Sequence, residues 1–310
     1  MLASTLVWLL PQLALTLVAA PLLNGWIKLV KARWQSRRGP GILQPSADIA
    51  KFLTRESVRS EYASWIFRAA PYVYFGAHLA AAMMVPMIWV HPPLAAMGDA
   101  IVFVGLLALA RFALGLAALD TASNFGGMGA ARELAFAAMT EPALLLGLLA
   151  LAVPASSTAF VDLASGNLTA ASRMLAFLAL FVVAIAETGR IPVDNPDTHL
   201  ELTMAHEGMI LEYSGRPLGL IMWAVHIKQL AIVSVLGALF FPWGIAQAGD
   251  AGSTLLGLVA FAVNAVVLGF VLAGVESSFA KLRVFRIPDL LGAAGVIAAL
   301  AFVALAVVGR

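Results

Sequence analysis

The chain has 310 residues, of which 62% are hydrophobic and 12% charged, and its mean hydropathy is +0.94. A soluble domain carries about 25% charged residues, so this composition excludes a soluble globular enzyme, a disordered chain and a nucleic-acid-binding protein. The formal net charge of +2 is also too small to attract a polyanion. The sequence has no cysteine, which excludes disulfides, cysteine-ligated zinc and any iron–sulfur cluster held by this chain.

Eight apolar stretches, each close to the roughly 20 residues that cross a bilayer, are predicted to form membrane-spanning helices. In chain order they cover residues 5–27, 69–90, 100–119, 134–153, 172–187, 217–241, 254–274 and 288–308. The first is predicted to be a retained helix rather than a signal peptide, because its Lys and Arg residues follow it and none precedes it. The sequence therefore predicts an all-α membrane protein of about eight transmembrane helices, with residues 1–310 forming one polytopic membrane domain.

The connectors between these stretches fall into two sets that alternate along the chain. One set holds fifteen of the nineteen Lys and Arg residues: 28–68, 120–133, 188–216 and 275–287. The other set holds none: 91–99, 154–171 and 242–253. Because an excess of Lys and Arg marks the cytoplasmic side, the large loops are predicted to be cytoplasmic and both termini to lie on the outer, periplasmic side of the inner (cytoplasmic) membrane. No internal repeat is visible, which disfavours a secondary transporter.

The connector 28–68 is basic and amphipathic, with nine Lys or Arg residues against three acidic ones. Residues 48–62 interleave apolar and basic side chains. This pattern predicts a helix in the membrane interface, with its basic face toward lipid phosphates or a partner protein. The alternative is that these charges only keep the loop on the cytoplasmic side.

The connector 188–216 has the opposite charge. Six acidic residues lie between positions 187 and 216: Glu187, Asp194, Asp197, Glu201, Glu207 and Glu212. If residues 197–212 form a helix, Glu201 and Glu212 share one face, because they are about three turns apart. Crowded carboxylates raise one another's pKa, so this cluster would exchange protons near neutral pH. The alternative is a polar cap that docks soluble partner subunits through Arg–carboxylate pairs.

Ionisable residues also fall inside the predicted spans or at their inner ends: Arg111, Glu141, Glu187, Lys228 and Glu276. Charge in the bilayer core is costly, so such residues usually face the bundle interior and mark ion or proton paths. The alternative for Glu141 is a structural ion pair with Arg111. No span carries two of the five histidines and no element has metal-ligand spacing, so no metal site is predicted and haem ligation is disfavoured.

Four segments, taken in order, resemble subunit 1 of respiratory complex I, the helical subunit at its quinone site. They are residues 38–56 (RGPGILQPSADIAKFLTRE); residues 123–132 (SNFGGMGAAR) followed by Glu141; residues 186–194 (AETGRIPVD) with Glu201-Leu202 and residues 212–215 (EYSG); and residues 281–289 (KLRVFRIPD). Within that family, residues 191–215 resemble formate hydrogenlyase subunit 4 and hydrogenase 4 component C, the membrane subunits of group 4 nickel–iron hydrogenases. Asp197 and His199 stand where complex I usually has Glu, in a loop that shapes its quinone site.

The resemblance implies a non-redox membrane subunit that anchors a soluble arm. That arm would contain the hydrogenase large and small subunits and further Fe–S subunits, and antiporter-like membrane subunits would adjoin this chain. The nickel–iron centre and Fe–S clusters would belong to the partners, with no cofactor bound by this chain and no nucleic acid. Coupling of the redox arm to ion translocation is also implied. The alternative is a quinone-site membrane subunit of a complex I-like dehydrogenase.

The resemblance also implies roles for particular side chains. A proton path is assigned to residues that match or neighbour the family's chain of acids: Glu141, Glu187, Asp194, Glu201, Glu207 and Glu212. Partner docking or ion pairing is assigned to Arg38, Lys51, Arg132, Arg190 and Arg283. Arg190 is expected to pair with carboxylates of its own connector.

Overall fold

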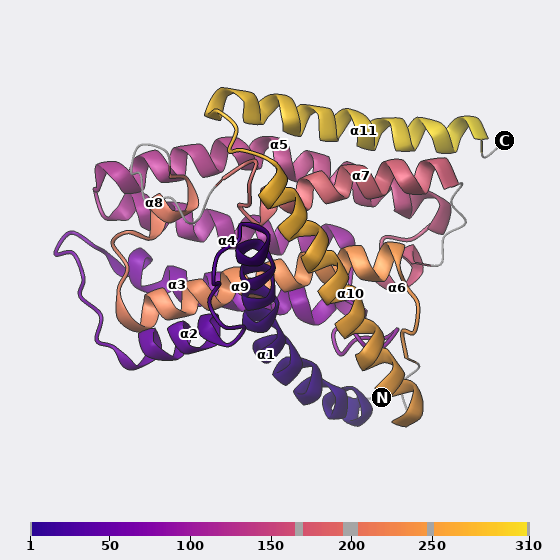
Figure 1. Cartoon of the computed structure of the whole chain (residues 1–310), viewed down its shortest axis with the longest axis horizontal. Coiled ribbons are helices and arrows are strands. Elements are labelled where there is room, and N and C mark those ends of the chain that lie inside the picture. Colours follow the sequence, from indigo (N-terminus) through magenta and orange to yellow (C-terminus); the bar gives the residue numbers. More distant parts are fainter. Residues whose placement is uncertain (1, 165–169, 195–203, 247–250, 309–310) are drawn as a thin grey trace.

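The computed structural model describes residues 2–164, 170–194, 204–246 and 251–308, which form a helical bundle (Figure 1). The long helices are α1 (Leu2–Trp34), α3 (Trp65–Met84), α4 (Ala100–Asp120), α5 (Asn124–Ala155), α7 (Ala170–Glu187), α9 (Gly215–Phe240), α10 (Ala251–Ser278) and α11 (Ile287–Val308). The short ones are α2 (Gln44–Thr54), α6 (Phe160–Leu163), α8 (His206–Ile210) and the 3₁₀ turns η1 (Ala95–Met97) and η2 (Val284–Arg286). In Figure 1, α8 and the connector after α2 lie at the left, and the last turns of α11 lie at the right.

The long helices confirm the prediction of an all-α, multi-pass membrane protein. Among the described residues, six helices are long and apolar enough to cross a membrane: Trp8–Trp34, Ala100–Asp120, Asn124–Ala155, Gly215–Phe240, Gly252–Ser278 and Val284–Leu305. The other two predicted spans, 69–90 and 172–187, coincide largely with the helices α3 and α7. The count of eight crossings, the single polytopic domain and the periplasmic placement of the termini stay predictions.

Helix α9 occupies the centre of the bundle. Residues 226–240 are buried without interruption, because the sequence is apolar on every side of the helix apart from a few polar positions. α9 packs against α1, α2, α3 and α10. Polar side chains on this helix, such as Lys228 and Gln229, therefore point into the protein wherever they face.

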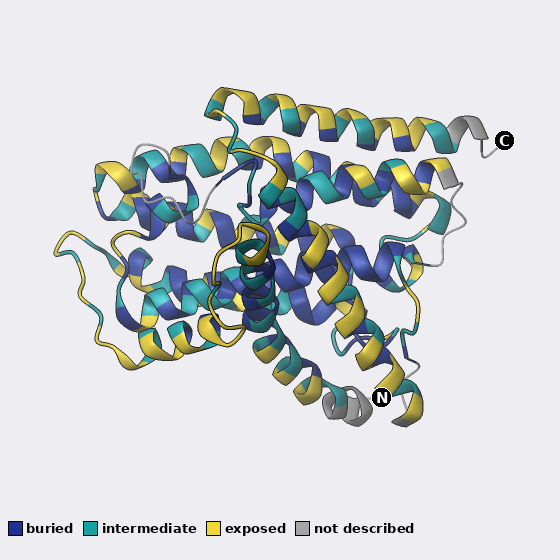
Figure 2. Ribbon diagram, in the orientation of Figure 1, coloured by how far each residue is buried: buried dark blue, intermediate teal, exposed yellow. Residues whose placement is uncertain are grey.

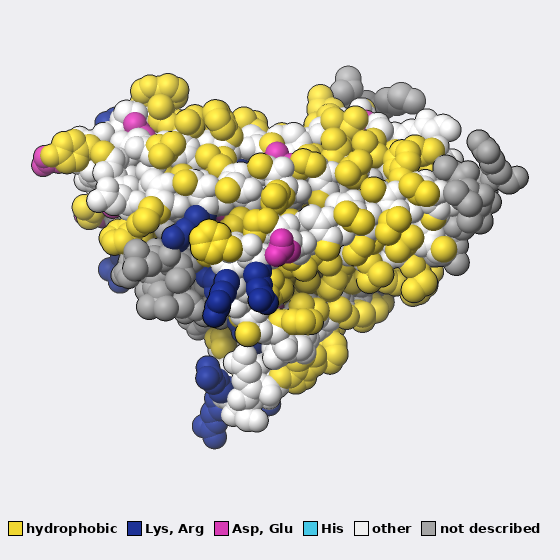
Figure 3. All heavy atoms as spheres, turned by 90° about the horizontal axis from the view of Figure 1, so that it is seen from above, with side chains coloured by type: hydrophobic (Ala, Val, Ile, Leu, Met, Phe, Trp, Pro, Cys, Tyr) yellow, Lys and Arg dark blue, Asp and Glu magenta, His cyan; other side chains and the backbone are white. Residues whose placement is uncertain are grey.

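Helices α10 and α11 keep wide apolar faces on the outside. Exposed side chains such as Val259, Val263 and Phe270 on α10, and Val296 on α11, form part of these faces (Figure 2). Figure 3 shows a mostly hydrophobic surface with Lys and Arg gathered in one region. Continuous apolar faces of this kind are covered by lipid in a membrane protein.

The amphipathic helix of the basic connector is shorter than the sequence predicts. α2 ends at Thr54, so the prediction of a helix over residues 48–62 is wrong beyond that point. The following segment pairs instead with the start of α9: the Val58 amide donates to Ser214 Oγ at 2.8 Å, and that hydroxyl donates to the Val58 carbonyl at 3.0 Å. These side-chain bonds compete with helix continuation. The buried Ile49 faces the protein, so α2 does not present all of its apolar residues to lipid.

Candidate functional site

A polar cavity of about 350 Å³ lies among α1, α5, α7, α8, α9 and the segment after α7. Its ionisable and amide-bearing lining residues are Asn24, Lys28, Lys31, Glu133, Glu187, Arg190, Asp194, His206, Glu207, His226, Lys228 and Gln229. α7 ends at Glu187, and Gly189 adopts a left-handed φ of +59°, which a residue without Cβ adopts readily. The chain thereby turns at the end of α7, and the segment that follows lines the cavity.

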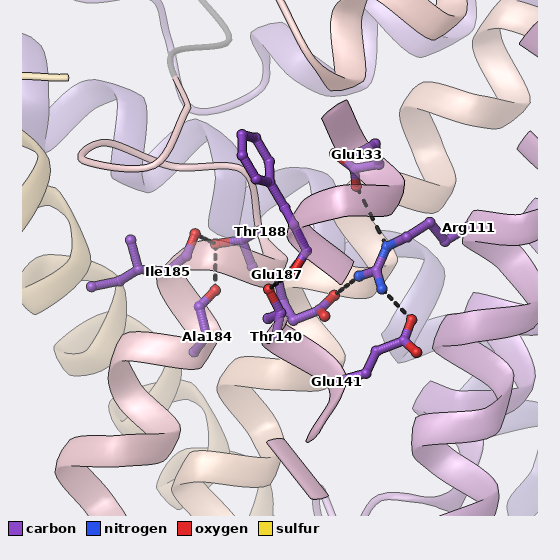
Figure 4. Close-up of polar contacts among 9 residues, drawn as sticks. Arg111, Glu133, Thr140, Glu141, Ala184, Ile185, Glu187 and Thr188 are labelled. Carbon is purple, nitrogen blue, oxygen red and sulfur yellow. Dashed lines mark hydrogen bonds and ion pairs between the residues drawn. The ribbon is translucent and has the colours of Figure 1, made fainter. Parts of the chain in front are cut away.

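Beside the cavity, the Arg111 guanidinium on α4 is shared by three carboxylates (Figure 4). Its Nη2 donates to Glu187 Oε2 at 2.5 Å, and its Nε lies 3.5 Å from Glu133 Oε1. Its Nη1 pairs with Glu141 Oε1. Arg111 and Glu187 are both buried. We call these four residues the Arg111 cluster; it joins α4, α5 and α7.

The Arg111 cluster has a chemical property that a simple ion pair lacks. It brings three carboxylates to one guanidinium, and that guanidinium keeps its proton in proteins. Carboxylates that interact so closely titrate as a unit, and a proton can be held by any one of them. Two of its members, Glu133 and Glu187, also line the cavity, so the cluster is in contact with the polar chamber.

A second buried network crosses the opposite side of the cavity. Arg190 Nη1 lies 2.9 Å from Glu276 Oε1 on α10, and Arg190 Nη2 donates to Gln229 Oε1 at 2.8 Å. The same Gln229 oxygen accepts from Asn24 Nδ2 at 3.1 Å, and Lys31 Nζ lies 3.4 Å from Glu276 Oε2. This network ties α1, α9 and α10 to the segment that follows α7.

The expected partner of Arg190 is corrected by this network. Among the described residues, Arg190 pairs with Glu276 rather than with a carboxylate of its own connector. Asp194, the described acid closest to it in the connector, lies 2.7 Å from Lys281 Nζ. The physical reason is the turn at Gly189, after which the chain runs beside α10 and the segment following it.

The cavity has the chemistry of a hydrated chamber. Five of its lining residues have a buried polar atom with no hydrogen-bond partner among the described residues: Asn24 Oδ1, Glu187 Oε1, His206 Nε2, His226 Nδ1 and Gln229 Nε2. Buried polar atoms in proteins are paired with protein or ordered water. A space of this size holds several water molecules, each with the two to four polar partners that it needs.

The predicted proton-path acids are only partly brought together. Glu187, Asp194 and Glu207 line the cavity, and Glu141 reaches it through Arg111. Glu212 is exposed and is not among the residues that line the cavity. Glu201 lies outside the described residues, as do Asp197 and His199.

The predicted helix over residues 197–212 is wrong in its described part, where α8 covers only His206–Ile210. After α8 the chain is held by Tyr213, whose ring stacks on Phe67 at 4.0 Å between centroids and whose hydroxyl donates to the Phe67 carbonyl at 2.9 Å. Burial raises the pKa of the Tyr213 phenol, so this hydroxyl stays a donor at neutral pH. Anchoring of Tyr213 inward leaves Glu212 on the surface.

The residues assigned to docking or ion pairing divide into two groups. Arg38, Lys51 and Arg283 are exposed. Arg132 is half-buried, and its Nη1 donates to the Met204 carbonyl at 3.0 Å, so it holds the segment that leads into α8. Together with the buried Arg190, it stabilises the protein's own loops.

Three residues of these networks were not singled out from sequence: Glu133, Asn24 and Gln229. Asn24 and Gln229 carried a usable signal, because each is a polar residue inside a predicted span or beside a charged one. Glu133 lies at the edge of a span, where an acid is unremarkable. Its proximity to Arg111 depends on how α4 and α5 cross.

His206 enters the cavity from α8. Burial lowers the pKa of His206 to about 3, with Lys228 nearby acting in the same direction. Its imidazole is therefore neutral at physiological pH and serves as a hydrogen-bonding partner for water rather than as a fixed charge.

The position of α8 depends on a glycine in α5. A Cβ on Gly129 would lie 2.8 Å from the Ala205 carbonyl oxygen and 2.9 Å from the Met209 nitrogen, both backbone atoms. Gly129→Ala is therefore expected to lower the stability of the solubilised protein by about 1–3 kcal/mol and to displace His206. A thermal melt in detergent measures the effect.

Gly292 in α11 is the matched control, since a Cβ there would meet nothing within 4 Å. Gly292→Ala is expected to leave the melting temperature unchanged or to raise it, because Ala is the better helix former by roughly 1 kcal/mol. Equal melting temperatures for the two variants would contradict a close α5–α8 contact.

Comparison with known proteins identifies the class. The NADH dehydrogenase family model matches residues 7–308, and the chain belongs to this family. The fold is shared with a chain of the membrane-bound sulfane sulfur reductase, an archaeal respiratory membrane complex, at a TM-score of 0.84 and 20% identity, covering 96% of this chain and 98% of that one.

Within the family, the chain is similar to hydrogenase membrane subunits. It is 39% identical to formate hydrogenlyase subunit 4 of Escherichia coli K12 over 94% of this chain and 96% of the relative. It is 38% identical to hydrogenase-4 component C of the same organism, over 96% and 95%. An NADH-quinone oxidoreductase subunit of Rubrobacter xylanophilus is 29% identical over 78% and 74%. The resemblance drawn from the sequence motifs is confirmed.

Proposed function

We propose that this chain is the membrane-anchoring, proton-path subunit of a group 4 nickel–iron hydrogenase complex of the formate hydrogenlyase or hydrogenase 4 type. It docks a soluble redox arm, adjoins antiporter-like membrane subunits and couples the arm to ion translocation. It lies in the inner membrane with eight crossings, both termini periplasmic and the large loops cytoplasmic. The identity to the two hydrogenase relatives over nearly the whole chain supports this assignment.

The observation that carries the proton path is the contact between the hydrated cavity and the Arg111 cluster. Glu133 and Glu187 belong to both. A proton that enters the cavity near Asp194 or Glu207 meets these carboxylates next and is passed to Glu141 within the helical bundle. Glu201 and Glu212 would extend this path toward the soluble arm. The chain itself carries no redox cofactor, so electrons stay in the partner subunits.

The docking surface that we propose is basic. Arg38, Lys51 and Arg283 are exposed, and they belong to the connectors predicted to lie on the cytoplasmic side. Acidic surfaces of the soluble arm would complement them. Arg132 and Arg190 support this surface indirectly by holding the connector between α7 and α9.

Deletion of this subunit tests the anchoring role. We expect most hydrogenase activity, measured with an artificial electron donor, to move from the membrane fraction to the soluble fraction while the arm itself stays assembled. Re-expression of the chain is the control and restores membrane attachment. An arm that remains on membranes without this chain would contradict the proposal.

The competing assignment is a quinone-site subunit. It is supported by the similarity to a subunit of an NADH-quinone oxidoreductase and by a cavity within the usual size of ligand pockets. The polar lining favours water and protons over a quinone ring. Quinone extracted from the purified complex in a one-to-one ratio would establish the competing assignment.

A further inference from the structure

Lys228 is a buried lysine in the middle of the apolar helix α9, with 7% of its surface exposed. Its neighbours along the helix are mostly apolar and equally buried. An ionisable group at this depth of a membrane protein is costly and faces the interior of the bundle. Neither the ion pairs of the Arg111 cluster nor the Arg190 network includes it.

The position of Lys228 is a partition between two spaces. Behind the large cavity lies a second space of about 10 Å³, which also contacts Tyr74, His78 and Arg111. Of the described residues, Glu133, His206 and Lys228 line both spaces. The smaller space is close to the volume that one water molecule occupies, so these three side chains separate the chamber from a single-water site beside Arg111.

The chemistry of the cations on this partition differs. The Arg111 guanidinium cannot release its proton, so a proton cannot pass through it. An ammonium group on a flexible four-carbon stem can both release and regain a proton. Lys228 makes no ion pair within 4.0 Å with a described residue, whereas Arg111 is fixed by three carboxylates. Lys228 is therefore the cation on this partition that is able to move and to exchange its proton.

We propose that Lys228 transfers protons between the hydrated cavity and the Arg111 cluster. Its ammonium gives a proton to a carboxylate oxygen of Glu133 or Glu187, directly or through the single water, and the resulting amine takes a new proton from water in the cavity. This inference deepens the proposed proton path and rests on it. The charged and titratable groups that face Lys228 are Tyr74 and His78 of α3, Arg111 of α4, Glu133 of α5, Glu187 of α7, His206 of α8 and, across the cavity, Lys28 and Lys31 of α1.

Three variants separate proton exchange from a fixed positive charge. Lys228→Arg keeps the charge but does not release its proton, Lys228→Met removes both, and Lys228→His keeps a titratable group with an ordinary pKa near 6.5 rather than 10.4. We expect the first two to lower the initial rate of proton translocation per hydrogen evolved by about tenfold or more. We expect Lys228→His to retain translocation with its pH profile moved toward acid.

The assay uses inverted membrane vesicles that contain the complete complex, with acidification followed by a pH-sensitive dye and hydrogen measured in parallel. Arg173→Met, an exposed cation on α7, is the control and should match the wild type. The amount of soluble arm on the vesicles shows whether each variant has assembled, and a variant that fails to assemble is replaced by the other two.

The outcomes distinguish this inference from the proposed function. Wild-type coupling and pH profile in Lys228→Arg would overturn proton exchange at Lys228, because a fixed charge would then suffice. The proposed path would still stand if Glu141→Gln lost coupling in the same assay. Coupling unchanged in Glu141→Gln and in all Lys228 variants would overturn both.

Discussion

Arg111→Met is expected to lower the stability of this protein by about 3–5 kcal/mol, because it leaves Glu133, Glu141 and Glu187 without their shared cation in a poorly hydrated site. The loss also removes the ion pairs that join α4, α5 and α7. Little full-length chain should then remain in membranes, and the melting temperature of what is purified should fall. Quantitative immunodetection of the chain in membranes and a thermal melt in detergent measure the effect.

Arg173→Met is again the control, since Arg173 is exposed on α7 and outside the cluster. It should change chain abundance and melting temperature little, as is usual for surface positions. If Arg111→Met were as stable as Arg173→Met, the three carboxylates would have to be accommodated without a cation, and the cluster would not hold α4, α5 and α7 together.

Glu187→Gln is expected to reduce coupled proton translocation by about tenfold or more, because Glu187 is the carboxylate that both lines the cavity and binds Arg111. The amide is close in size and can still accept from Arg111, so the chain should stay folded. Glu141→Gln, further along the proposed path, and Glu201→Gln in the acidic connector are expected to reduce coupling as well. Dye-monitored acidification of vesicles, divided by the rate of hydrogen evolution, gives the coupling.

Asp250→Asn is the matched control for these substitutions, because Asp250 lies in a connector predicted to face the opposite side of the membrane. It should leave coupling unchanged. Coupling that tolerates Glu187→Gln and Glu141→Gln as well as Asp250→Asn would rule out a relay through these acids.

Much of the fold was predictable because its main determinant is apolar length. Runs of about 20 apolar residues gave helices at the expected positions, since backbone groups in a bilayer must be satisfied within the helix. The pairing of Arg111 with Glu141 was also accessible as an alternative, because two opposite charges in adjacent spans have few other partners. The site as a whole was less accessible.

The missing information concerns helix rotation and crossing. α9 is buried on all sides between positions 226 and 240, so its sequence has no apolar face from which to infer where Lys228 and Gln229 point. Arg190 reaches Glu276 across 86 positions, a contact set by the turn at Gly189 and the path of α10. Likewise, Glu212 is turned outward by the inward anchoring of Tyr213, which no spacing rule anticipates.

The burial of the Arg190–Glu276 pair gives the molecule two electrostatic systems with different responses to ionic strength. Salt at molar concentration shortens the screening length to about 3 Å and weakens contacts between exposed charges, but it acts much less on buried pairs. The basic surface at Arg38, Lys51 and Arg283 is exposed, whereas both side chains of the pair are buried. Washing with concentrated salt therefore loosens whatever binds the basic surface while the wall of the cavity stays closed.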